Sequence, residues 1–259
     1  MSLSKKETNN IEIVLKNALR HKFQNYNPEL DSMPFHTRLL GKDRMALFSF
    51  IQSLNTNFGT SIFEPIAVIL AKNKFEIADS QVAVGKYISE SALFIIQKIM
   101  DDLAAANTTP NKTKEIEIIR EVCQKGKMRK VKLTKIDVYL KSKNNELFLL
   151  DLKTAKPNKG EFEGFKRTLL EWVASILADD PNAKINTLIA IPYNPYEPKP
   201  YSRWTMAGML DLERELKVAA EFWNFLAGKE CYENLLKCFE KVGIELREEI
   251  EEYFNKYNK

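Results

Sequence analysis

The chain has 259 residues, of which 44% are hydrophobic and 29% charged, as in an ordinary soluble globular protein with a sizeable buried core. No apolar run reaches the roughly 18 residues of a membrane span, and the N-terminus lacks the apolar part of a secretory signal, so we expect a cytoplasmic protein with no membrane partner. The net charge is only +4, so any affinity for nucleic acid would come from local clusters of basic residues.

The N-terminal part of the chain is predicted to be helical. Apolar residues recur at helical spacing in four stretches, which are 11–24, 43–54, 61–73 and 91–103. A polar turn at 107–113 then leads to a mixed central segment. There we expect strands at 131–140 and 146–154 joined by a short polar hairpin, an amphipathic helix over 160–180, and a buried strand over 185–192.

A proline-rich loop at 193–204 precedes a C-terminal part that is predicted to be helical again. Helices are expected at 211–228 and 231–243, closed by Gly228 and Gly243, and at 244–257. We therefore expect one domain over 1–259 of the α/β class. Its predicted segments are a mainly helical part (1–106), an α/β core (114–192) and a loop with C-terminal helices (193–259). The three cysteines are odd in number and widely spaced, and are expected to be free thiols in the core.

Three charged residues stand among apolar neighbours in the two central strands. Asp151 and Lys153 are two residues apart, so they share one face of a strand, and Asp137 can reach them from the neighbouring strand. The other face of the second strand is wholly apolar. An isolated carboxylate in such surroundings costs several kcal/mol unless it is paired or binds a metal, so these aspartates need a cation.

Two interpretations of the three charges are open. In the first, Asp151 and Lys153 are a buried ion pair that only closes a sheet, because an Asp-x-Lys triplet alone is common. In the second, Asp137 and Asp151 hold Mg²⁺ with the Leu152 carbonyl as a further ligand, and Lys153 prepares a water to attack a phosphodiester.

The spacing of these residues resembles that of the PD-(D/E)xK nuclease superfamily. Asp137 is followed fourteen residues later by Asp151-Leu152-Lys153, then by an amphipathic helix and a strand, although Ile136 stands where the motif has proline. More narrowly, the chain is similar to the TdeIII family of type II restriction endonucleases from about Met33 to Gly228. The similar stretches are MPFHTRLL, FGTSIFEPIAVILA, KIDVYL, LDLKTAKPNKGEFEGFKRTLLEW and AEFWNFLAG.

This resemblance implies a fold and a function. The expected fold is a restriction-endonuclease-like core, a mixed central sheet flanked by helices, with helical N- and C-terminal additions. The expected activity is Mg²⁺-dependent cleavage of double-stranded DNA at a short sequence of the GGNCC kind by a homodimer, with a cognate DNA methyltransferase as functional partner. Two alternatives stay open: a repair or junction-resolving nuclease on the same core, and a DNA-binding protein without activity.

Further site residues follow from the resemblance and from residue chemistry. The superfamily places an acidic residue on the helix before the sheet, and Glu64 matches it; alternatively, Ser61 and Glu64 form a capping box. Candidates for contacts to DNA lie in three places, and they are Lys156, Asn158 and Lys166 near the second strand, Lys199 and Arg203 in the proline-rich loop, and His36 and Arg38 in MPFHTRLL. The alternatives are turn chemistry for the first group and packing for the others.

The segment between Lys125 and Lys135 carries six basic residues and no acidic one. It is either a phosphate-binding surface or a strand edge that lysines protect from pairing.

Overall fold

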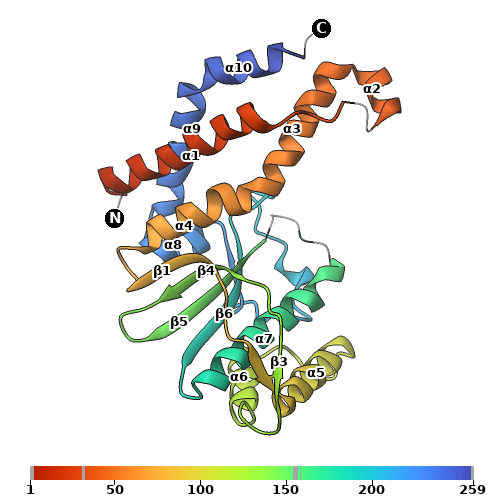
Figure 1. Cartoon of the computed structure of the whole chain (residues 1–259), viewed down its shortest axis with the longest axis vertical. Coiled ribbons are helices and arrows are strands. Elements are labelled where there is room, and N and C mark those ends of the chain that lie inside the picture. Colours follow the sequence, from red (N-terminus) through yellow and green to blue (C-terminus); the bar gives the residue numbers. More distant parts are fainter. Residues whose placement is uncertain (1–2, 31–32, 154–156, 158, 258–259) are drawn as a thin grey trace. The chain divides into compact units, whose positions relative to one another are not determined.

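The computed structural model describes residues 3–30, 33–153, 157 and 159–257 (Figure 1). The chain folds into two compact units, a helical unit (1–69 with 228–259) and a sheet unit (70–227). These boundaries differ from the expected divisions near 106 and 192, because the helices at the two ends of the chain pack together and the sheet begins earlier than expected. Among the described residues, no helix combines the length and the apolar character that crossing a membrane requires.

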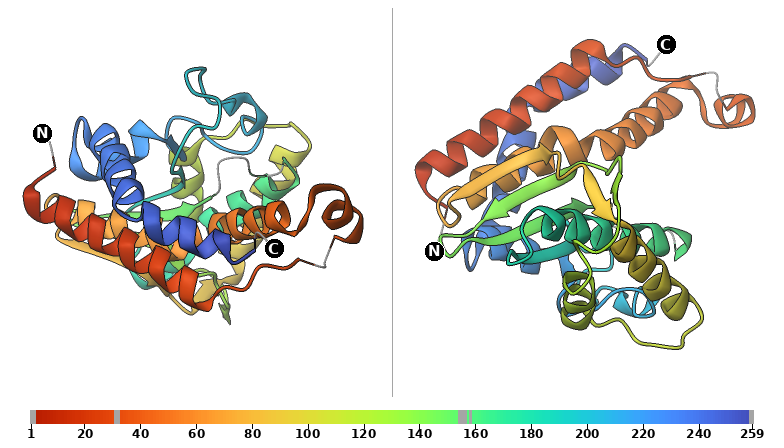
Figure 2. Two further views of the ribbon diagram at one scale, coloured as in Figure 1. Left: turned by 90° about the horizontal axis from the view of Figure 1, so that it is seen from above. Right: turned by 60° about the horizontal axis from the view of Figure 1, so that its bottom comes forward.

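The regular structure described in the helical unit is entirely helical. Its elements are α1 (Lys5–Asn25), α2 (Pro34–Leu40), α3 (Lys42–Phe58), the π-helical segment η1 (Gly59–Phe63), the first part of α4 (Glu64–Ala71), α9 (Cys231–Glu245) and α10 (Arg247–Asn255). Within this unit α1 packs against α9, and the N-terminal and C-terminal helices lie together in both views of Figure 2. Phe50 on α3 contacts Phe23 on α1 and both Tyr253 and Phe254 on α10, so aromatic packing joins the two ends of the chain.

A single proline accounts for the π-helical segment in the helical unit. Pro65 has no amide hydrogen, and its ring clashes with the carbonyl group four residues earlier, that of Ser61. The chain widens by one residue there, and the Glu64 amide bonds to the Gly59 carbonyl. Because α3, η1 and α4 form one helical run, no helix begins at Ser61, and the capping box considered for Glu64 is not formed.

The sheet unit contains a five-stranded mixed sheet with the order β1-β4-β5-β6-β7. In this sheet β4 pairs in antiparallel orientation with both β1 and β5. The strand β6 pairs in parallel orientation with both β5 and β7. The five strands are β1 (Ile77–Val82), β4 (Ile136–Lys141), β5 (Glu146–Leu152), β6 (Lys184–Ile191) and β7 (Leu216–Val218). A separate ribbon pairs β2 (Tyr87–Ser89) with β3 (Met128–Lys130) in antiparallel orientation.

Helices cover both faces of the five-stranded sheet. The helices of this unit are α5 (Glu90–Ala104), α6 (Lys112–Arg120), α7 (Phe162–Asp179) and α8 (Ala220–Ala227), with short 3₁₀ turns η2 (Lys159–Glu161) and η3 (Arg203–Thr205). On one side α7 packs against β6, α5 and α6 (Figure 1). On the other side Phe148 of β5 contacts Phe75 and Phe225, the latter on α8. The expected α/β class, a mixed sheet flanked by helices, is confirmed.

Several predicted elements differ from the structure. The N-terminal part, expected to be mainly helical, contains β1 and β2, and α6 was not predicted. The predicted helix over 211–228 is wrong in its first half, where Leu216–Val218 forms β7 instead. This short segment pairs with β6 and buries Leu216 and Val218, and that tertiary pairing overrides the local helical pattern. Gly228 ends a helix with φ of +99°, as expected, but α9 continues through Gly243 to Glu245.

Candidate active site

The hairpin of β4 and β5 brings the predicted acidic residues together. Val138 pairs with Leu150 in this antiparallel ladder, so the next pair toward the open end is Asp137 opposite Asp151. Directly opposed residues have Cβ atoms about 5 Å apart, and their side chains point to the same face. Lys153 follows just beyond β5, where its amide bonds to the Ala190 carbonyl at 3.0 Å and holds it beside β6. The prediction that the three charges converge on one face is confirmed.

Short polar contacts fix each of the three side chains. The Lys153 Nζ lies 2.7 Å from Asp151 Oδ1 and 4.7 Å from the centre of the Phe165 ring on α7. The Asp137 carboxylate accepts a hydrogen bond of 2.7 Å from the Leu152 amide and one of 3.2 Å from Gln81 Nε2. The ammonium of Lys153 is therefore held between a carboxylate and an aromatic face.

The charge balance of this cluster is negative, and the Asp151 carboxyl shows the effect. Asp151 is 7% exposed. Burial raises its pKa to about 6; the Lys153 ammonium opposes this shift, and the nearby charge of Asp137 adds to it. One ammonium does not balance two carboxylates, so the site favours an additional cation.

The cluster faces an open pocket of about 690 Å³ in the sheet unit. Its lining includes Gln81, Thr134 and Lys135, together with residues of η2 and the first turns of α7. Gly160 and Gly164 are among these, and a Cβ atom added at either position would meet no atom within 4 Å. These glycines leave the helix backbone accessible to a bound molecule.

Gln81 is a site residue that the sequence analysis missed. It lies on the edge strand β1 with φ of +56°, in the left-handed region that side chains other than glycine rarely adopt. Such strain persists where surrounding structure holds it, and it is concentrated at functional sites. The only signal in the sequence was a polar pair, Ser80-Gln81, near the end of a strand. Phe165 was missed as well, because its position does not depart from an ordinary helix pattern, and Lys135 was noted only as the last residue of the basic segment.

The donor atoms at this pocket fit a hard divalent cation. Mg²⁺ keeps several waters and is commonly held by one or two carboxylates, which Asp137 and Asp151 supply. Within the described residues there is no cluster of three or more His, Cys, Asp or Glu side chains that could hold a metal. The negative charge balance at Asp151 agrees with a cation at this place.

Lys166 was predicted to contact a DNA phosphate, and this prediction is wrong. Its side chain is fully buried, and its Nζ lies 2.6 Å from both Glu115 Oε2 and Glu215 Oε2. Glu215 also pairs with the buried Lys112 at 2.9 Å. The helical periodicity of the sequence predicted that Lys166 lies near the pocket, but it did not predict the direction of its side chain. It points toward α6 and the segment before β7.

We call this group of Lys112, Glu115, Lys166 and Glu215 the buried ion network. Burial alone would raise the pKa of Glu215, but the ammonium groups of Lys112 and Lys166 outweigh it and keep that pKa below its usual value. Burial lowers the pKa of Lys112, and the Glu215 carboxylate opposes this shift. With two ammonium groups and two carboxylates, the network is balanced in charge.

Among the described residues of the sheet unit, the other predicted residues, Lys199 and Arg203, do not line the pocket described above. Lys156 and Asn158 lie outside the described residues. Lys199 is exposed in the proline-rich loop, and Arg203 is held by the Glu221 carboxylate at 2.7 Å. His36 and Arg38 are exposed on α2 in the helical unit.

Glu64 also belongs to the helical unit, where it is 2% exposed at the start of α4. Its part in the site stays a prediction.

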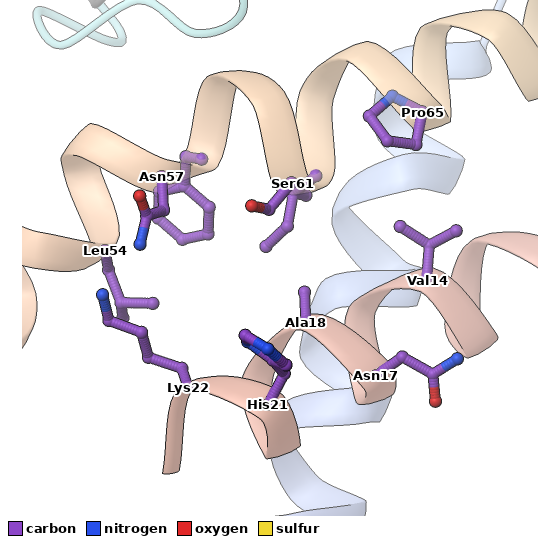
Figure 3. Close-up of a pocket in the computed structure, with 11 residues that line it drawn as sticks. Val14, Asn17, Ala18, His21, Lys22, Leu54, Asn57, Ser61 and Pro65 are labelled. Atoms are coloured by element: carbon purple, nitrogen blue, oxygen red, sulfur yellow. The ribbon is translucent and has the colours of Figure 1, made fainter. Parts of the chain in front are cut away.

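A second pocket lies within the helical unit, between α1 and the α3–η1 run (Figure 3). Its volume is about 330 Å³. The lining is apolar apart from five residues with polar groups, and it contains no carboxylate; these five are Asn17, His21, Lys22, Asn57 and Ser61. It therefore offers no acidic ligands for a magnesium ion, unlike the pocket at Asp137 and Asp151.

Comparison with known proteins identifies the family of the chain. Residues 3–243 match the family described as type II restriction endonuclease, HinfI. The type II restriction enzyme MjaII of Methanocaldococcus jannaschii is 29% identical over 259 aligned positions, which cover 89% of this chain and 68% of that enzyme. The type II restriction enzyme HgiCII of Herpetosiphon aurantiacus is 24% identical, with 85% and 81% covered. The chain thus belongs to the HinfI family of type II restriction endonucleases, which are site-specific deoxyribonucleases that bind double-stranded DNA.

Proposed function

We propose that this restriction endonuclease hydrolyses DNA phosphodiesters with Mg²⁺, at the pocket formed by Asp137, Asp151 and Lys153, by the chemistry of the PD-(D/E)xK superfamily. The observation that carries the proposal is the register of β4 and β5, which sets two carboxylates opposite each other beside one ammonium. The open pocket in front of them has room for a phosphodiester. A buried pair that only closed a sheet would need neither the second carboxylate nor the open pocket.

Each residue of the cluster has a distinct proposed task. Asp137 and Asp151, with the Leu152 carbonyl, would hold Mg²⁺, which would withdraw charge from the phosphoryl group and stabilise the departing oxygen. Asp137 is kept in one orientation by the Leu152 amide and Gln81. Lys153, fixed between Asp151 and Phe165, would donate a hydrogen bond that orients the attacking water and would offset negative charge that develops on the phosphoryl group. Glu64 would support the metal shell from the α4 helix.

The finer features of the substrate and the assembly follow the TdeIII resemblance. We propose a recognition sequence of the GGNCC kind, which is two-fold symmetric apart from its centre, and a homodimer in which each subunit cuts one strand. Lys156 and Asn158 would contact the backbone near the cut, while Lys199, Arg203, His36 and Arg38 are candidates for base or backbone contacts. A cytoplasmic location and a cognate DNA methyltransferase as functional partner belong to the same proposal.

Digestion of a DNA of known sequence with Mg²⁺, followed by mapping of fragment ends, tests this proposal. We expect ends at one short sequence, and no cleavage by Asp151→Ala although DNA binding is retained. Asp180→Ala is the matched control, since Asp180 is exposed beyond the far end of α7 and should cut like the wild type. Unchanged cleavage by Asp151→Ala would refute the site, and cleavage of any duplex regardless of sequence would indicate a repair-type nuclease.

A further inference from the structure

A line of exposed basic residues runs from the β2–β3 ribbon to the active-site pocket. We define the basic strip as Lys86, Lys127, Lys130, Lys132 and Lys135, all of which are exposed. Lys135 lines the pocket, two residues before Asp137. The strip therefore begins at the proposed cleavage site and extends away from it along the surface of the sheet unit.

Backbone contacts hold the strip in an extended form. Lys130 pairs with Tyr87 in the ribbon, and the Val131 amide bonds to the Lys86 carbonyl at 2.9 Å. Nearer the pocket, Trp172 Nε1 of α7 donates to the Thr134 carbonyl at 3.0 Å. Val131 and Leu133 are partly buried while Lys130 and Lys132 are exposed, so alternation turns the lysines outward.

The charges of the strip are not compensated locally. Arg129, in the same segment, forms an ion pair with Glu90 and does not add to the free charge. In the described parts of the chain the five lysines of the basic strip form no ion pair, and no acidic residue occurs between Lys125 and Lys135. Five ammonium groups along one line make a surface of strongly positive potential.

Protection of a strand edge does not account for this arrangement. Lysines that block edge pairing need to lie on the strand itself. In this chain β3 ends at Lys130, whereas Lys132 and Lys135 lie beyond it in a segment without strand partners. The charge continues up to the pocket, where a polyanionic substrate would be bound.

We propose that the basic strip binds the phosphate backbone of double-stranded DNA that flanks the cleaved sequence. This inference rests on the proposed function, because it places the scissile phosphate in the pocket beyond Lys135. The segment from Lys130 to Lys135 spans roughly 17 Å, about the length over which one DNA strand presents five phosphates. Lysine contacts of this kind supply affinity without reading sequence. The exposed phenol of Tyr87 beside Lys130 offers a hydrogen bond to the same backbone.

Salt-dependent binding to two duplexes tests the strip. One duplex contains little more than the cleaved sequence, and the other adds about one helical turn, 10 bp, on each side. Binding is measured without divalent metal, for the wild type and for Lys130→Gln/Lys132→Gln. On the longer duplex we expect the double variant to bind roughly tenfold more weakly, with a salt slope lower by about 1 for each lysine removed. On the shorter duplex it should bind like the wild type.

The matched control is Lys143→Gln/Lys184→Gln, which removes two exposed lysines at the opposite end of the sheet. This control should leave both duplexes and both salt slopes unchanged. The strip is refuted if the two double variants have equal slopes on the longer duplex while the wild type cuts at its sequence. If the wild type cuts at no sequence, the proposed function fails first, and the two failures are thus distinguishable.

Discussion

Two clusters of charged residues lie in the sheet unit, one on each side of the first turns of α7. The buried ion network joins two ammonium groups with two carboxylates, and every member has a partner of opposite charge within 2.9 Å. The cluster of Asp137, Asp151 and Lys153, the proposed active site, sets one ammonium against two carboxylates and faces an open pocket. Both contain a lysine ion-paired to a carboxylate, yet only the second has charge left to bind a cation and a substrate.

We infer from this difference that the buried ion network serves stability and that the other cluster serves activity. A buried network with balanced charge holds elements together. Removal of one of its charged residues leaves an uncompensated charge in the core. An unbalanced cluster is unfavourable without its ligand, and enzymes retain such clusters at sites where function requires them. Lys166 and Lys153, one lysine from each cluster, are thirteen residues apart in sequence, and we expect substitution of the first to affect mainly stability and of the second mainly activity.

The largest effect is expected from exchanging these lysines for methionine. Lys166→Met should lower the free energy of unfolding by about 3–5 kcal/mol, because Glu115 and part of the charge of Glu215 stay buried without a partner. Lys153→Met should lower it by about 1–2 kcal/mol at most, since the Asp151 carboxyl can take up a proton instead. Lys153→Met should however reduce cleavage by roughly 10²–10⁴-fold. Urea unfolding and cleavage rates under saturating DNA measure both properties.

A compensating variant serves as the control for the buried ion network. Adding Glu115→Gln to Lys166→Met removes one buried carboxylate and should restore part of the lost stability. Equal stability of Lys166→Met and the wild type would show that the network contributes nothing to the fold. Full activity of Lys153→Met would remove the lysine from the mechanism.

An intermediate effect is expected from neutralising Asp151 without metal. The folded pKa of about 6 lies above the ordinary value of 3.8, so the folded state holds its proton more firmly than the unfolded state does. The free energy of unfolding of the wild type therefore falls as the pH rises from 3.8 to 6. Above pH 6 this loss of stability is complete. A pKa difference of about 2 corresponds to about 3 kcal/mol, so Asp151→Asn should be more stable than the wild type by up to that amount at pH 8.

Urea unfolding in a chelating buffer at pH 8 and at pH 3.5 measures this prediction. The two proteins should differ at pH 8 and converge at pH 3.5, where the wild-type carboxyl is protonated in the folded state. Asp180→Asn, an exposed position, should match the wild type at both values. A less stable Asp151→Asn at pH 8 would mean that the pair with Lys153 outweighs burial, and the cluster would then resemble the balanced network.

Sequence reasoning predicted the strand that carries Asp151 and the convergence of Asp137, Asp151 and Lys153, because a period of two fixes which residues share a face. It also predicted α1, α3, α5 and α7, in which apolar residues recur at helical spacing over a long stretch. It did not predict β7, whose three residues become a strand only through pairing with β6.

The sequence was least informative about the direction of individual side chains and about backbone strain. Lys166 occupies a helical turn close to the pocket, but its side chain points to Glu115 and Glu215, which come from segments far away in sequence. Gln81 adopts a positive φ that no pattern of residue types announces. Both features depend on which segments pack side by side, and local periodicity does not contain that information.

The smallest effect concerns Gln81, and two substitutions separate its backbone from its side chain. Gln81→Gly and Gln81→Ala both remove the hydrogen bond to Asp137, so each should lower the cleavage rate, by roughly tenfold, with little change in DNA binding. Glycine adopts φ of +56° without a steric penalty and alanine does not, so Gln81→Gly should be the more stable by about 1 kcal/mol. Equal stability of the two variants would show that the strand carries no strain, and wild-type cleavage rates in both would show that Asp137 is oriented by the Leu152 amide alone.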